Sequence, residues 1–314
     1  MITIEHGSGH VVGASIGERL GIAAMRLAAL LLRPLDKFGL SRVTRFISSL
    51  WPSGNVVRVG LAEDAAFEMP YGEGYWARLL PRRWEYEGEI ESVLTAIAPT
   101  EFTFLDCGAN YGLWSVLVSS RRFGNHPAIA IEAAPDTYTW LERNCAGNGN
   151  RFLVYNRALG AKSGTWVELY GEKHEARSVA APAAGGAVPV SMVETLALDD
   201  LFAPAGLPEG ARIVLKLDVE GAELETLAGA TGILRHETLV IYEDHGSDRE
   251  HSLTRHLKDT LGMRVFAWQR GGVFEVRDIE ELTALKPNRR VGYNFFATRH
   301  DFWAARLKDI RPKG

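Results

Sequence analysis

The sequence is poor in cysteine and in long apolar runs, and it has no excess of positive charge. Its 314 residues include two cysteines, Cys107 and Cys145, too few for a disulfide framework, so we expect a reducing compartment. The sequence contains no run of about 20 apolar residues, the length that a membrane-spanning helix needs. We expect no signal peptide, because Glu5 and His6 occupy the positions where a signal peptide carries basic residues. The net charge of −4 argues against nucleic acid as a partner. These absences favour a soluble, cytoplasmic enzyme.

The composition is that of an ordinary globular protein, with 46% hydrophobic and 24% charged residues. The length allows one large domain with a smaller appendage. We place an N-terminal extension at residues 1–84 and the main domain at residues 85–314. Nine histidines form no HExxH motif and no zinc spacing with cysteine, so we expect no metal site of that kind.

The extension is predicted to contain one helix and one small hairpin. Residues Ile16–Leu32 are rich in Ala and Leu with helical periodicity, and Pro34 ends the pattern. Arg19, Arg26 and Arg33 are spaced by seven, roughly along one face. Two interpretations stay open: the helix packs on the main domain or on a second copy, or it lies on an anionic membrane surface. The hairpin is predicted over Val56–Val59 and Ala65–Met69.

The main domain alternates short apolar runs with helical stretches, which is typical of a parallel sheet covered on both faces. Seven strands are predicted: Phe102–Asp106, Ala128–Glu132, Arg151–Ala158, Arg212–Asp218, Thr238–Glu243, Arg264–Gln269 and Asn294–Arg299. Five helices are predicted: Trp84–Ile97, Leu113–Arg122, Pro135–Ala146, Ala222–Ala230 and Arg249–Leu261. A strand at Trp166–Tyr170 is expected to form a hairpin with the strand before it, and residues 180–187 are expected to form a flexible connection.

The strongest chemical signal is the segment Phe102–Gly112, FTFLDCGANYG, which an apolar helix follows directly. In doubly wound sheets, the turn after the first strand faces the ligand crevice. Gly108 and Gly112 allow the backbone to approach a ligand closely, while Asp106 places an acid at the mouth of the crevice. The acid would repel a pyrophosphate and attract a cationic ligand. The plain structural alternative is a tight turn with a helix cap.

Glu132 ends the second strand, where an acid can accept hydrogen bonds from both ribose hydroxyls. Together with the acid in the first turn, it suits a nucleoside that carries a sulfonium and an amino group. That ligand is S-adenosylmethionine. A nicotinamide-dependent dehydrogenase would share Glu132, but it would need a phosphate where Asp106 stands.

A third segment, Ile213–Glu223, places ionisable groups at the end of a central strand. Because a buried lysine is costly unless it is paired, we expect Lys216 to meet a carboxylate. The candidate general bases are Asp218 and Glu220, with Glu243 and His245 from the next strand as second choices. The same acids could instead bind Mg²⁺, or Lys216 and the acids could form a purely structural ion pair.

Several motifs in this order resemble the FkbM family of S-adenosylmethionine-dependent methyltransferases, over about residues 85–300. They are FLDCGANYG at 104–112, AIEAAP at 130–135, NRALG at 156–160, VETLALDDL at 193–201, VLKLDVEGAEL at 214–224 and VIYE at 240–243. The resemblance implies a class I, Rossmann-like α/β fold with seven strands, the last one antiparallel. It also implies O-methylation, often of sugars or natural products.

By the same resemblance, the methionine part of the cofactor would be held by Asp106, Gly108, Ala109, Asn110 and Gly112. Glu132 would bind the ribose with Ala133 beside it, and Asn156 and Ala158 would border the adenine. Asp199 lies in a matched motif, and it could cap the next helix instead of contacting the cofactor. Alanines at 133 and 134 and the extra Ala197 depart from the family pattern.

The acceptor is not fixed by these motifs. We expect the acceptor to be a small molecule or a glycoside that is methylated on a hydroxyl group. Two alternatives stay open: methylation of a nitrogen, or a non-catalytic scaffold that binds the cofactor and associates with a membrane. The aromatic residues Trp51, Tyr71, Tyr75, Trp76 and Trp84 could form an acceptor surface, or they could belong to the core. The Ala/Leu-rich helix would also suit a homodimer contact.

Overall fold

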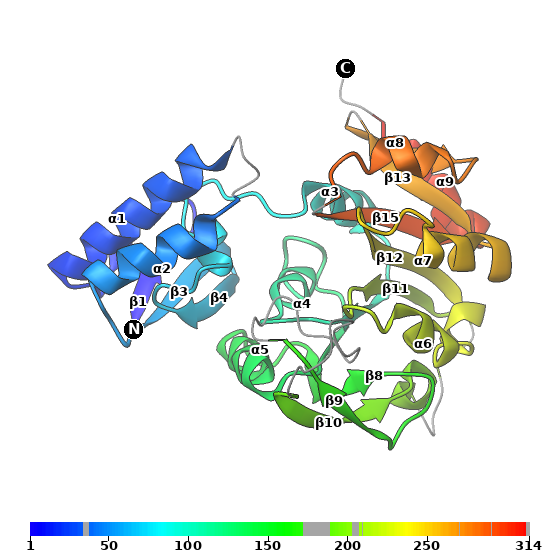
Figure 1. Cartoon of the computed structure of the whole chain (residues 1–314), viewed down its shortest axis with the longest axis horizontal. Coiled ribbons are helices and arrows are strands. Elements are labelled where there is room, and N and C mark those ends of the chain that lie inside the picture. Colours follow the sequence, from blue (N-terminus) through cyan, green and yellow to red (C-terminus); the bar gives the residue numbers. More distant parts are fainter. Residues whose placement is uncertain are drawn as a thin grey trace.

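The computed structural model of the chain describes residues 1–33, 38–171, 189–202, 207–208, 210–269, 271–289 and 291–311. The connection predicted over residues 180–187 lies outside these ranges. The described chain forms a large central sheet, a small sheet beside it and an N-terminal unit (Figure 1).

The central sheet has the strand order β14-β13-β15-β12-β11-β5-β6-β7. Its bounds are β5 Thr103–Cys107, β6 Ala128–Glu132, β7 Leu153–Asn156, β11 Arg212–Leu217, β12 Glu237–His245, β13 Arg264–Gln269, β14 Gly272–Val276 and β15 Gly292–Thr298. Strands β7, β6, β5, β11 and β12 are parallel, whereas β15 is antiparallel to both of its neighbours. All seven predicted strands are present, and the eighth, β14, pairs with β13 at the edge.

Both faces of this sheet are buried, because successive residues of its apolar strands point to opposite sides. In β11, Val214 belongs to the core on one face, while Ile213 and Leu215 belong to the core on the other. The first core is closed by α3, Gly88–Ile97, α4, Leu113–Val118, α5, Pro135–Gly147, and α9, Asp301–Asp309. The second is closed by α6, Glu223–Ala228, α7, Ser252–Arg255, and α8, Glu281–Leu285. The fold is the α/β sandwich predicted from the sequence.

Several predicted details are wrong: the strand expected over Arg151–Ala158 is divided into β7 and β8, Ala158–Leu159, which belong to different sheets, and the helix expected over Leu113–Arg122 ends at Val118. Strand β9, Trp166–Leu169, pairs with β10, Ser191–Leu196, and not with the strand before it. Strand β10 also pairs with β8 and therefore lies between the two strands that were expected to form a hairpin.

Two further differences concern the predicted helices. The helix expected from Trp84 begins at Gly88, because Glu87 has the left-handed φ of 44°. The helix expected over Arg249–Leu261 is divided into α7 and a π-helical turn, His256–Thr260.

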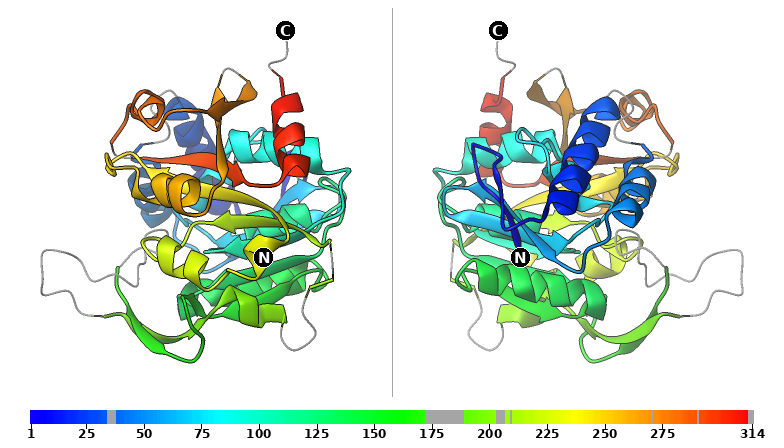
Figure 2. Two further views of the ribbon diagram at one scale, coloured as in Figure 1. Left: turned by 90° about the vertical axis from the view of Figure 1, so that its right-hand side faces the viewer. Right: turned by 90° about the vertical axis from the view of Figure 1, so that its left-hand side faces the viewer.

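The N-terminal unit is more than a helix and a hairpin. Its sheet has the order β2-β1-β3-β4, with bounds β1 Ile2–Ile4, β2 Val11–Val12, β3 Val56–Ala62 and β4 Ala65–Pro70. The predicted hairpin is β3 and β4. Helices α1, Ile16–Leu31, and α2, Leu40–Leu50, cover this sheet, and α1 lies at the outer front of the unit (Figure 2, right).

The N-terminal sheet is joined to the main domain by polar side chains of α5. Asn144 exchanges hydrogen bonds with the backbone of Glu68, and Asn148 does the same with Ala66, so both asparagines continue the edge of β4. The two parts also share one apolar core, in which Phe67 meets Tyr111. The boundary between residues 84 and 85 stays a prediction. Among the described residues, no helix is long and apolar enough to cross a membrane.

Candidate functional site

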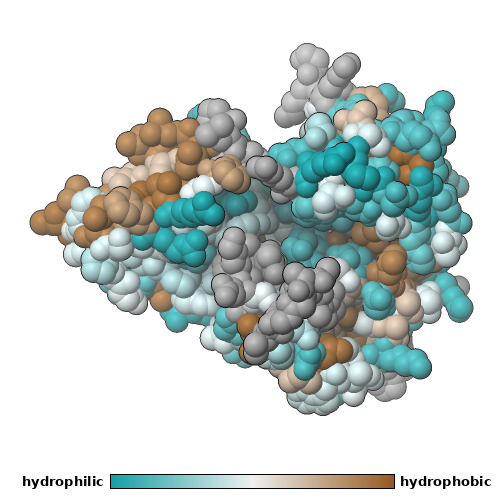
Figure 3. Space-filling model, viewed as in Figure 1, coloured by the Kyte–Doolittle hydropathy of each residue, from teal (hydrophilic) through white to brown (hydrophobic). Residues whose placement is uncertain are grey.

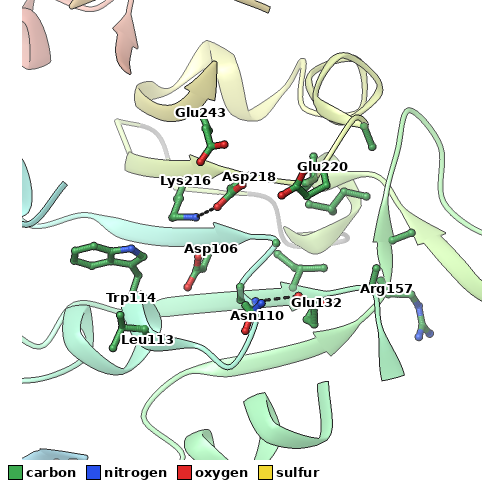
Figure 4. Close-up of a pocket in the computed structure, with 18 of the residues that line it drawn as sticks. Asp106, Asn110, Leu113, Trp114, Glu132, Arg157, Lys216, Asp218, Glu220 and Glu243 are labelled. Atoms are coloured by element: carbon green, nitrogen blue, oxygen red, sulfur yellow. Dashed lines mark hydrogen bonds and ion pairs between the residues drawn. The ribbon is translucent and has the colours of Figure 1, made fainter. Parts of the chain in front are cut away.

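A cavity lies at the carboxyl ends of β5, β6, β11 and β12 (Figure 4). Tyr75, Trp76, Tyr86 and Glu87, from the segment before α3, also line it. Carboxyl ends of parallel strands are the place where such sheets bind ligands. The cavity is lined by Tyr75, Trp76, Tyr86, Glu87, Asp106, Gly108, Ala109, Asn110, Leu113, Trp114, Ile131, Glu132, Ala133, Arg157, Ala158, Leu159, Leu169, Lys216, Asp218, Val219, Glu220, Ala222 and Glu243.

The turn after β5 needs glycine at position 108. Gly108 has a φ of 79°, and a Cβ placed there would lie 1.7 Å from the carbonyl oxygen of Asp218. No other residue allows this approach of two strand ends. Asn110 follows with a φ of 53°, a conformation that asparagine tolerates. The turn therefore presents backbone groups to the cavity.

Asp106 lies under this turn, almost fully buried. Its Oδ2 accepts hydrogen bonds from the backbone N–H and the hydroxyl of Ser115, at 3.2 and 2.6 Å. Burial raises the pKa of Asp106, and the nearby cation of Lys216 works in the opposite direction. Ser115 thus fixes the orientation of the carboxylate that the sequence placed at the mouth of the crevice.

Glu132 is held at the edge of the cavity by two backbone N–H groups. Asn110 donates to Oε2 and Ala134 donates to Oε1, each at 2.9 Å, and the side chain is 8% exposed. Asn156 in turn donates to the carbonyls of Glu132 and Ala133. A carboxylate fixed in this way fits the ribose of S-adenosylmethionine, and the glycine turn beside it fits the methionine part.

A cluster of acids faces this turn across the cavity. The carboxylates of Glu87, Asp218 and Glu243 each offer an oxygen within 4.8 Å of the others. Lys216, 4% exposed, donates to Asp218 Oδ2 at 2.7 Å, which confirms the predicted pairing with a carboxylate (Figure 4). Burial alone would lower the pKa of Lys216, but the surrounding acids raise it above its ordinary value.

The same crowding makes several acids titrate near neutral pH. Burial, reinforced by the charges of Asp218 and Glu87, raises the pKa of Glu243 to about 8. Burial also raises the pKa of Glu87 to about 7, although Lys216 opposes the shift. For Glu220, burial and the charge of Asp218 raise the pKa to about 7. Such acids are suited to accept a proton from a substrate at physiological pH.

The cluster could also offer oxygen ligands to a divalent cation. Lys216, however, already places a buried positive charge on Asp218. The geometry therefore favours proton transfer.

Most of the predicted site residues lie together in the cavity. Asp106, Gly108, Ala109, Asn110, Glu132, Ala133 and Ala158 line it on one side, and Lys216, Asp218, Glu220 and Glu243 line it on the other. Three predicted residues lie outside the lining. Gly112 precedes α4 with a φ of 85°, Asn156 supports Glu132, and His245 is exposed and bonded to Ser247.

Asp199 caps a helical turn, which was one of its two predicted roles. Its carboxylate accepts hydrogen bonds from the backbone N–H groups of Gly232 and Ile233, both at 2.8 Å. These groups begin the short 3₁₀ helix Ile233–Arg235.

Sequence reasoning missed Glu87 and the two aromatic residues next to it, Tyr86 and Trp114. Trp114 donates its indole N–H to Glu87 at 2.6 Å, and Tyr86 stacks on Trp114. Tyr75 and Trp76 complete this aromatic wall of the cavity, and the hydroxyls of Tyr75 and Tyr86 lie 2.9 Å apart. Of the five aromatic residues singled out in the sequence, Tyr75 and Trp76 line the cavity. No motif marks Glu87, because only the left-handed backbone before α3 brings it to the strand edge.

Comparisons with known proteins show which family the chain belongs to. Residues 106–294, more than half of the chain, match the family described as the Methyltransferase FkbM domain. The chain is similar to methyltransferase sdnD of Sordaria araneosa, with 35% identity, 42% of this chain and 61% of that protein covered. It is also similar to hexuronic acid methyltransferase AglP of Haloferax volcanii, with 25% identity and coverages of 55% and 68%.

The chain thus spans less than two thirds of sdnD. Among solved structures, methyltransferase FkbM of Methylobacillus flagellatus KT overlaps 63% of this chain and 43% of its own, with 15% identity and a TM-score of 0.38. The strand order described above, and not this overlap, defines the fold. From its sequence match and its cavity, the chain belongs to the FkbM family of methyltransferases, which use S-adenosylmethionine as the methyl donor.

Proposed function

We propose that this chain transfers a methyl group from S-adenosylmethionine to a hydroxyl group of a sugar or natural product. The observation that carries the proposal is the cluster of Glu87, Asp218 and Glu243, which lies across the cavity from the glycine turn after β5. The similarity to AglP, which is named as a hexuronic acid methyltransferase, supports a sugar acceptor, and the similarity to sdnD supports methyl transfer.

On the donor side, the residues of this chain bind and orient. Gly108, Ala109 and Asn110 would contact the methionine part through their backbone, while Glu132 would accept hydrogen bonds from the ribose. Bound S-adenosylmethionine supplies a methyl carbon on a positively charged sulfur. The surrounding carboxylates would attract and orient the sulfonium, and holding its methyl carbon in line with the acceptor oxygen would supply much of the rate gain.

On the acceptor side, we assign Glu243 as the general base. An alcohol becomes a good nucleophile only as its proton leaves, and a carboxylate with a pKa of about 8 is a stronger base, once ionised, than an ordinary carboxylate. Gly292 on β15 makes room for this side chain, because a Cβ there would lie 1.7 Å from Glu243 Oε1. Asp218 suits the role less well, since its Oδ2 already accepts a hydrogen bond from Lys216.

Lys216 is a positioning residue in this scheme. It holds Asp218 in place, and its charge limits how far the pKa values of Glu87 and Glu243 rise. The wall of Tyr75, Trp76 and Tyr86 would stack on the acceptor, as aromatic rings do with sugar faces and apolar rings. The expected partner is therefore a small molecule or a glycoside and not nucleic acid, and a cytoplasmic location stays a prediction.

The testing experiment is a screen for methyl transfer with a labelled donor. The acceptors are neutral glycosides, uronides, hydroxylated natural-product fragments and amino sugars. Because an acidic cluster also attracts amines, label found on nitrogen of an amino sugar alone would replace the proposal by N-methylation. With a productive hydroxyl acceptor, Glu243→Gln should lose transfer while it keeps binding of S-adenosylhomocysteine. Loss of both would make Glu243 a donor ligand, and unchanged transfer would remove it from the mechanism.

A further inference from the structure

The N-terminal helix pair has a large exposed apolar surface. Of the seventeen large hydrophobic side chains that are exposed among the described residues, nine lie within residues 16–50. They are Ile16, Leu20, Leu27, Leu30 and Leu31 from α1, Phe38 from the segment after it, and Val43, Phe46 and Leu50 from α2. We call this set the apolar helix face. Figure 3 shows hydrophobic residues gathered over α1 and α2 on the viewed side.

The face does not result from α1 being a poorly packed helix. Gly21, Ile22, Met25 and Ala29 are buried against the N-terminal unit, so the helix already packs with its inner side. Its outer side is apolar as well, and Ile16 is 80% exposed. A helix that is apolar on all sides is normally buried on all sides. The exposed apolar area therefore indicates an interaction site.

The charges around the face have one sign. In α1 and α2, the single acid among the described residues is Glu18, which is buried and bonded to Ser15, Ser53 and Asn55. Arg19, Arg42 and Arg45 are exposed. Residues 34–37, outside the described ranges, carry one acid and one base in the sequence and add no net charge.

The arginines predicted to share a face have different roles. Arg26 points into the unit, where its guanidinium donates to the carbonyls of Leu80 and Gly9 at 2.8 Å. Arg33 pairs with Glu85. The exposed positive charge of the helix pair is thus supplied by Arg19 of α1 and by Arg42 and Arg45 of α2.

We propose that the apolar helix face docks on a membrane surface that contains anionic lipid. The apolar side chains would insert among the acyl chains at the membrane surface, and the neighbouring arginines would contact the negative headgroups. The described residues of the two helices include no exposed acid that would oppose this binding. A second copy of the chain fits less well. A twofold interface brings the same patch against itself, so arginines would meet arginines without an acid to pair with.

The test is flotation of the whole chain with vesicles. Phosphatidylcholine vesicles mixed with phosphatidylglycerol should bind the protein, and vesicles of phosphatidylcholine alone should bind it more weakly. Leu27→Glu together with Phe46→Glu should lower the partition coefficient by about tenfold or more for each substitution, because each removes an apolar side chain that docking would bury in the membrane. Phe274→Glu, at an exposed phenylalanine on β14, is the matched control and should bind like the wild type.

A second variant tests the charges without risk to folding. Arg42→Gln with Arg45→Gln alters two exposed side chains and should weaken binding to the anionic vesicles by about fivefold for each arginine. No binding of the wild-type chain to anionic vesicles would overturn the proposal. So would a wild-type dimer in light scattering that Leu27→Glu with Phe46→Glu dissociates, because the apolar helix face would then be the contact between two copies.

Discussion

The role of Glu243 leads to a sharp dependence of turnover on pH. A general base acts only when it is ionised, and burial beside Asp218 and Glu87 raises the pKa of Glu243 to about 8. At pH 7, about one tenth of the molecules would have Glu243 ionised, and at pH 9 about nine tenths. Turnover should therefore rise about tenfold between these two pH values.

The presence of this rise distinguishes a base with a raised pKa from an ordinary carboxylate. Burial also raises the pKa values of Glu87 and Glu220, to about 7, so either of them would give a rise in the same direction. A carboxylate with an ordinary pKa near 4.5 is fully ionised across the range and would give no rise. Removing the base by Glu243→Gln should abolish the slope and lower turnover by about 100- to 10,000-fold.

The assay is release of S-adenosylhomocysteine from the acceptor that the screen identifies, at saturating substrates and constant ionic strength. Glu101→Gln, at an exposed acid, is the matched control and should keep the wild-type profile. A flat wild-type profile between pH 7 and 9, or an unchanged slope in Glu243→Gln, would refute the assignment of Glu243 as the base.

Four further outcomes are expected. Glu132→Ala removes a charged acceptor of ribose hydrogen bonds and should weaken S-adenosylhomocysteine binding by about 10- to 100-fold in calorimetry. Gly292→Ala places a Cβ on the carboxylate of Glu243 and should lower turnover, whereas donor affinity measured alongside stays unchanged. Lys286→Met strands the buried carboxylate of Asp244, 2.6 Å from the lysine Nζ, and should cost about 3–5 kcal/mol in urea unfolding. Chelation by EDTA should leave turnover unchanged, because the buried cation of Lys216 already pairs with Asp218, one of the three clustered carboxylates.

The strands of the central sheet could be predicted because their signal is local. The run Ala128–Glu132, for example, is apolar up to its final glutamate, which is typical of a strand buried on both faces, and its bounds agree with the structure. The errors are non-local. The partner of β9 lies more than twenty residues further along the chain, so a hairpin turn before β9 was a misleading guide. The short strand β1 lies between β2 and β3, and its partner β3 is more than fifty residues further along the chain.

The part of the site that faces the methyl donor could also be predicted, because its signal is local. Gly108 and Glu132 belong to single turns whose spacing carries the chemistry. The acceptor side was not, because it is assembled from separate parts of the chain. Glu87 enters through a backbone conformation that glutamate rarely adopts, and the pKa of Glu243 depends on burial that no motif reports.

We propose that the carboxylates at the carboxyl ends of the central strands hold S-adenosylmethionine. Titration calorimetry of the folded chain with S-adenosylhomocysteine tests it without knowledge of the acceptor. One equivalent should bind, Glu132→Ala should weaken the binding, and NAD should give no heat. Absence of binding by folded protein, or saturable binding of NAD in its place, would contradict the account.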